Sequence, residues 1–116
     1  MPEQSFPTTR RLLHSREFDA VFNQSDYRIS HREVLILAKL NTLGTSRLGM
    51  VISKKNFPKA VARNRVKRSI REVFRRLPAM DLDIVVLGRR GADTPEGRRG
   101  IVAAFDELIK RRQQDS

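Results

Sequence analysis

The sequence of 116 residues contains no cysteine. The chain can therefore form no disulfide framework, no thiolate metal site and no cysteine nucleophile. No run approaches the roughly 18 consecutive apolar residues that suggest a membrane-spanning helix. The segment from Met1 to Arg10 lacks the apolar centre of a signal peptide. These absences lead us to expect a cytoplasmic protein.

Acidic residues are scarce. The chain has 13 Asp and Glu against 24 Lys and Arg, which gives a formal net charge of +11. A compact domain with this excess repels itself unless a polyanion neutralises it. Nucleic acid is the expected partner, because neutralised phosphates release condensed counterions. An anionic membrane is disfavoured, since a membrane-binding helix needs a free apolar face and a core this small has none to spare.

The sequence also lacks the residue patterns that are typical of catalytic sites. We find no Gly-rich phosphate loop, no paired carboxylates and no metal-ligand spacing. His14 and His31 fall in different elements, where surface or structural roles are expected. Asp81 and Asp83 flank a strand entrance, where turn and solvent roles are expected. We therefore predict no catalytic residue, no metal site and no cofactor or small-molecule substrate bound by the protein alone.

Hydrophobic periodicity predicts an α/β (α+β) single-domain sandwich, in which helices pack on one small mixed sheet. The expected order is α-β-β-α-β-α, with a flexible arm at residues 1–10, one nucleic-acid-binding domain at 11–112 and a tail at 113–116. The expected elements are a short helix after the N-cap Ser15, an antiparallel hairpin of strands 34–40 and 48–53, a long helix opening at 57–59 and ending at Pro78, a strand at 82–87, and a last helix capped by Thr94. Residues 23–30 read as a polar turn.

The most informative stretch runs from Lys54 to Arg76, KKNFPKAVARNRVKRSIREVFRR. It holds ten of the 24 basic residues and one acid, Glu72. On a helical wheel its polar residues fill a continuous sector of roughly 100° opposite an apolar stripe; these residues are Asn64, Lys67, Arg68, Arg71 and Arg75. Solvated helix faces usually mix charges through i,i+4 pairs. Because this face has almost no acid, we favour phosphate contact over an ordinary solvated surface.

Several linked elements of this stretch resemble the signature of the bacterial ribonuclease P protein. They are Arg63-Asn64-Arg65, Lys67-Arg68 and Arg71-Glu72, preceded by the basic loop from Ser53 to Val61. Ribonuclease P is the ribonucleoprotein that removes the 5′ leader from precursor tRNA. The resemblance covers about residues 11 to 112. It implies a compact α/β domain with a left-handed βαβ crossover, a hand that general rules would not predict.

The resemblance also implies a division of labour. In the family the RNA subunit binds the catalytic Mg²⁺ and performs the hydrolysis, while the protein stabilises that RNA and grips the leader of the precursor tRNA. Carried over by position, the residues that bind RNA are Lys54, Lys55, Lys59, Arg63, Asn64, Arg65, Lys67, Arg68 and Arg71. Phe18 and Phe22 line the leader cleft.

Two readings of Phe18 and Phe22 stay open. Their spacing of four residues is typical of core packing on one helix face, whereas the resemblance favours stacking on leader bases. The family often has a further aromatic residue on the first strand of the sheet, but residues 34–40 are aliphatic here apart from Lys39.

Three other functions are alternatives to that of a ribonuclease P protein. A ribosomal or other structural RNA-binding protein with no role in cleavage would share the composition. A DNA-binding helix in the major groove would need base-reading side chains, and this face offers only Asn64 and Ser69 besides cations. A protein-only nuclease is disfavoured by the missing carboxylate cluster.

Overall fold

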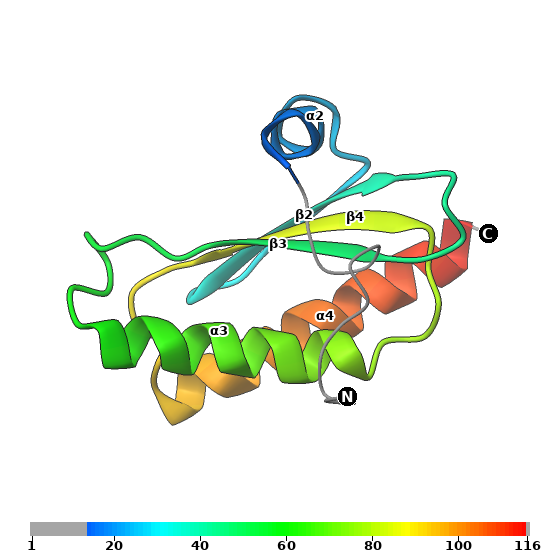
Figure 1. Ribbon diagram of the computed structural model, residues 1–116. Helices are drawn as coiled ribbons and strands as arrows, with labels where there is room; N and C mark the ends of the chain where they lie inside the picture. The colour runs from blue at the N-terminus through cyan, green and yellow to red at the C-terminus, as the bar shows by residue number, and fades with distance from the viewer. Residues whose placement is uncertain (1–13, 116) are drawn as a thin grey trace, which may run out of the picture.

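The computed structural model describes residues 14–115, so the arm expected at residues 1–10 lies outside the described part. The elements are α2 (Ser15–Gln24), β1 (Tyr27–Ser30), β2 (Val34–Leu40), β3 (Arg47–Val51), α3 (Ala60–Arg75), β4 (Leu82–Gly88) and α4 (Pro95–Asp115). The strands form one mixed sheet in the order β1-β2-β4-β3. Helix α2 covers one face of this sheet, and α3 and α4 cover the other (Figure 1). The predicted α/β sandwich is confirmed.

Strand β1 was not expected, because residues 23–30 were interpreted as a polar turn. Its four residues pair antiparallel with β2, and Ile29 lies opposite Ile36. Tyr27 and Ile29 are buried while Arg28 and Ser30 are exposed. Two apolar residues in alternation are too few for a strand to be recognised from its period. The order of elements is therefore α-β-β-β-α-β-α, with one strand more than predicted.

The predicted hairpin of residues 34–40 and 48–53 is wrong, because β4 lies between β2 and β3. Strand β4 pairs antiparallel with β2 and parallel with β3. Six of its seven residues are buried, and a strand that is apolar on both faces belongs in the middle of a sheet. Helix α3 is thus the crossover between the parallel neighbours β3 and β4. The left hand of this crossover stays a prediction.

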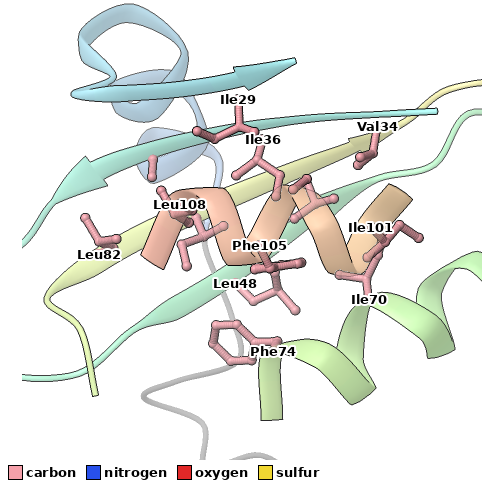
Figure 2. Packing of buried hydrophobic residues seen from close by; sticks show 14 of the residues in the cluster. Ile29, Val34, Ile36, Leu48, Ile70, Phe74, Leu82, Ile101, Phe105 and Leu108 are labelled. Atoms are coloured by element: carbon pink, nitrogen blue, oxygen red, sulfur yellow. The ribbon is translucent and has the colours of Figure 1, made fainter. Parts of the chain in front are cut away.

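The main core lies between the sheet and the pair α3 and α4 (Figure 2). Helix α3 contributes the predicted stripe, in which Val66, Ile70 and Phe74 follow one another at intervals of four and are fully buried. The sheet and α4 supply the facing side chains Ile29, Val34, Ile36, Leu48, Leu82, Ile101, Phe105 and Leu108. The stripe fixes which side of α3 faces solvent.

Helix α3 begins later and ends earlier than predicted. Its N-cap is Lys59 and its last residue is Arg75. Phe57, expected in the first turn, instead lies in the preceding loop with its ring buried in the core. Anchoring this ring holds the basic loop against the domain.

At the other helix ends, one predicted cap is confirmed and two predicted boundaries differ from the structure. Thr94 caps α4 as predicted, since its Oγ1 accepts a hydrogen bond from the Gly97 N–H at 3.0 Å. Helix α4 continues to Asp115, so the expected tail at 113–116 starts inside the helix. The N-cap of α2 is His14 rather than Ser15, and the His14 N–H donates to Glu17 Oε1 at 2.6 Å.

Candidate nucleic-acid interface

The solvent side of α3 carries the predicted cationic face. Asn64, Arg65, Arg68 and Arg71 are exposed, and Lys67 is half-buried at the border with the apolar stripe. The loop before the helix adds Lys54, Lys55 and Lys59, all exposed. The structure therefore brings eight of the nine predicted RNA-binding residues to the surface of one helix and its leading loop.

The described part of the chain does not neutralise these cations. Within residues 14–115, none of the cationic residues among the nine predicted RNA-binding positions forms an ion pair. Glu72, the acid on α3, pairs with Arg98 of α4 at 3.4 Å and not with a residue of its own helix. A surface that holds this much uncompensated charge attracts a polyanion.

Arg63 differs from its neighbours in the motif. Its Nη1 donates to the backbone oxygens of Phe57 and Pro58, at 2.9 and 3.0 Å. The side chain is half-buried and holds the loop that precedes α3. Arg63 thus has a structural role in shaping the interface beside the RNA contact expected for it.

The opposite face of the sheet holds the two phenylalanines of α2. A small buried cluster of Val21, Leu37 and Val85 joins α2 to the sheet, and Phe18 packs against it. Phe22 is 43% exposed. The core interpretation therefore fits Phe18, whereas the ring of Phe22 is accessible to a ligand.

An apolar row continues beyond the part of the sheet that α2 covers. Leu35, Leu87 and Val51 are direct partners across β2, β4 and β3. Leu35 and Leu87 are half-buried on the α2 face, and alternation along β3 puts Val51 on that face too. Val51 is 37% exposed. After Val51 the chain continues through Ser53 to Lys54, so the basic loop begins next to the apolar row.

A part-buried ion network fixes α2 over the sheet. Arg47 donates from Nε and Nη2 to the two oxygens of Asp83, each at 2.8 Å, and from Nη1 to Glu17 of α2. Asn41 Nδ2 adds a hydrogen bond to Asp83 at 2.8 Å. The solvent role expected for Asp83 is wrong, since this residue is buried.

The network shifts the pKa values of Arg47 and Glu17. Hydrogen bonding to Asp83, followed by that to Glu17, raises the pKa of Arg47 against the opposing effect of burial. The backbone hydrogen bond from His14, with a smaller contribution from Arg47, lowers the pKa of Glu17. Sequence reasoning missed Arg47 and Glu17, because no spacing connects residues of three separate elements.

One histidine joins two distant elements of the fold. His31 Nε2 lies 3.0 Å from Glu107 Oε1 and joins the turn after β1 to α4, in line with the structural role expected for it. Among residues 14–115, no three His, Cys, Asp or Glu residues gather into a group that could hold a metal ion. No helix in that range is long and apolar enough to cross a membrane.

Comparisons with known proteins show the family of this chain. The family model described as Ribonuclease P matches residues 6–113. The ribonuclease P protein component of Marinobacter nauticus is 48% identical over 94 residues, which cover 80% of this chain and 71% of that protein. The same component from Saccharophagus degradans is 47% identical over 114 residues, covering 92% of this chain and 80% of that protein.

The solved structure of the RNase P protein from Thermotoga maritima superposes with a TM-score of 0.69 at 31% identity, covering 88% of this chain and 96% of that one. The residues matched by the family model, 6–113, include the elements that carry the cationic face and the apolar row. The chain belongs to the ribonuclease P protein component family.

Proposed function

We propose that this chain is the protein subunit of a cytoplasmic bacterial ribonuclease P, and that it binds the RNA subunit through the exposed side of α3. The observation that carries the proposal is the row of cations from Lys54 to Arg71, which form no ion pair with any residue between 14 and 115 and follow the order of the family motif. Each phosphate that these side chains neutralise releases counterions, so binding gains free energy without any base-specific contact.

The protein's share of the reaction is charge neutralisation and positioning. The described residues gather no cluster of carboxylates and imidazoles that fits a catalytic magnesium ion. We propose that phosphate oxygens of the RNA subunit hold Mg²⁺, which stabilises the developing charge when bound. The cations of α3 lower the repulsion between RNA strands that approach one another near that site.

We further propose that the α2 face of the sheet holds the 5′ leader of precursor tRNA. The accessible ring of Phe22 and the apolar row of Leu35, Leu87 and Val51 offer surfaces on which bases can lie. Stacking and apolar contact tolerate any base, because every base has a flat π-face. Leaders that differ in sequence can therefore share one cleft.

Reconstitution tests the proposal directly. The protein is mixed with bacterial ribonuclease P RNA at low Mg²⁺, and mature 5′ ends of precursor tRNA are scored. We expect cleavage where the RNA alone is inactive, and none by the protein alone. Absence of stimulation, or cleavage by RNA-free protein at constant specific activity, would contradict the proposal. Copurification with ribosomal RNA, instead of one ribozyme-like species, would favour the alternative of a structural RNA-binding protein.

A further inference from the structure

A groove of about 420 Å³ runs between α3 and the start of α4. The two helices lie side by side there (Figure 1). We call it the arginine groove, because Arg65 lines it from α3 and Arg98 and Arg99 line it from α4. One acid, Asp93, also lines it. Arg65 belongs to the family motif, but no motif residue lies on α4, so the resemblance assigns no role to the α4 side of the groove.

The three guanidinium groups are available to a ligand. Arg65 is exposed and forms no ion pair with another residue in the range 14–115. Arg98 contacts Glu72 at 3.4 Å and Arg99 contacts Glu96 at 3.7 Å, and the two arginine side chains are 66% and 73% exposed. Exposed pairs of this kind are weak. A phosphate can replace such a carboxylate, because guanidinium and phosphate form two parallel hydrogen bonds.

Close packing fixes the position of the α4 wall. A Cβ atom at Gly97 would lie 2.1 Å from the Gly91 backbone oxygen, so the first turn of α4 sits directly against the preceding loop. Thr94 Oγ1 donates to the same oxygen at 2.6 Å and accepts from the Gly97 N–H. Arg98 and Arg99 therefore extend from a rigid turn, which limits the ordering that a ligand must impose.

The groove continues the cationic face of α3. Arg65 and Arg68 are three residues apart, so they are neighbours on the helix surface. A nucleic acid that lies along the exposed side of α3 can thus reach the groove past Arg65 without crossing an apolar surface.

We propose that the arginine groove binds a phosphodiester segment of the ribonuclease P RNA, and that Arg65, Arg98 and Arg99 contact its phosphates. This inference rests on the proposed function. It extends the RNA contact from one helix to two, and it assigns α4 a binding role in addition to its place in the core.

The test compares two double variants of α4 with matched charge loss. Arg98→Gln with Arg99→Gln removes the two groove cations of α4 and two exposed ion pairs. Lys110→Gln with Arg111→Gln removes two cations and one exposed ion pair about 18 Å further along the same helix. Affinity for bacterial ribonuclease P RNA is measured across a salt series, and hydroxyl-radical footprints of the RNA are recorded. Melting temperatures show that both variants fold.

We expect the groove variant to bind at least tenfold more weakly at moderate salt and its log–log salt slope to fall by about two units. One protected RNA segment should disappear from its footprint, while the control variant keeps wild-type affinity and footprint. Equal loss in both variants, or an unchanged footprint in the groove variant, would overturn the inference. If Arg68→Ala weakens binding and the groove variant does not, the inference about the groove is wrong and the proposed function is retained. If the unmutated protein does not bind the RNA, the proposed function itself fails.

Discussion

Arg47 and Asp83 are direct partners across the parallel strands β3 and β4, and their side chains form a two-pronged salt bridge on the α2 face. The third guanidinium nitrogen of Arg47 reaches Glu17. One side chain therefore links an edge strand, the central strand and the helix that carries Phe18 and Phe22. The orientation of α2 depends on this link as well as on the small apolar cluster around Val21.

The first prediction concerns the loss of this link. Arg47→Met should lower the free energy of unfolding by about 3–5 kcal/mol, because Asp83 would remain buried without its partner. Thermal unfolding followed by circular dichroism measures the change. Arg47→Lys keeps the charge but cannot form the two-pronged bridge, so its loss should be intermediate. A melting temperature for Arg47→Met equal to that of the unmutated protein would show that the bridge does not stabilise the fold.

The second prediction is a pH dependence at Glu17. The folded protein lowers the pKa of this carboxyl below its ordinary value of 4.5. Its stabilising effect is therefore fully present above that value, and it is lost as the pH falls through the lower folded pKa. Glu17→Gln should be less stable than the unmutated protein at neutral pH, and the difference should shrink below about pH 4.5. Denaturant unfolding at several pH values measures it.

The control for this measurement is Asp19→Asn. It removes an exposed carboxylate from the same helix, one that forms no hydrogen bond or ion pair with any residue from 14 to 115. Its stability should stay close to that of the unmutated protein across the pH series. A difference for Glu17→Gln that stays constant with pH would speak against a titrating role.

The third prediction contrasts two glycines of α4. Alanine in place of glycine usually stabilises a helix by roughly 0.5–1 kcal/mol. At Gly97 the added Cβ would meet the Gly91 oxygen at 2.1 Å, so Gly97→Ala should instead destabilise by about 1–3 kcal/mol. At Gly100 the nearest atom is Glu33 Oε1 at 2.8 Å, the end of a side chain that can turn away. Gly100→Ala should therefore be neutral or stabilising, and equal melting temperatures for the two variants would refute the difference in packing.

The fourth prediction separates the two phenylalanines. Phe22→Leu should leave the melting temperature nearly intact, because the side chain is 43% exposed and leucine keeps its apolar character. It should weaken binding of leader-bearing precursor tRNA to the holoenzyme by about 1–3 kcal/mol while sparing mature tRNA. Phe18→Leu is the matched comparison and should lower stability more, since Phe18 packs against the cluster under α2. If both affinities fall together for Phe22→Leu, the ring does not contact the leader.

Hydrophobic periodicity correctly predicted the features that depend on one continuous stretch of sequence. The apolar stripe of Val66, Ile70 and Phe74 lies at fixed helical spacing, and it is buried as expected. The exposed cations of α3 follow from the same wheel, because burial of one side exposes the other. Thr94 was recognisable as an N-cap from its position before Pro95.

Features that depend on distant pairs could not be predicted in this way. The short loop between residues 40 and 48 favoured a hairpin, but β4 is more completely apolar than β3 and takes the central place. The bridge between Arg47 and Asp83 follows from that placement and has no local signal. The arginine groove likewise depends on how α4 crosses α3, which neither helix specifies alone.

The central position of β4 has a consequence for the order in which the domain can fold. Arg47 and Asp83 are 36 residues apart, and β3 has no other strand beside it within residues 14–115. Such nonlocal pairing forms slowly, because the intervening loop must close before any contact is gained. A chain shortened before Leu82 would leave β2 and β3 as open edges that invite aggregation. Loss of the last third of the chain would thus remove the middle of the sheet.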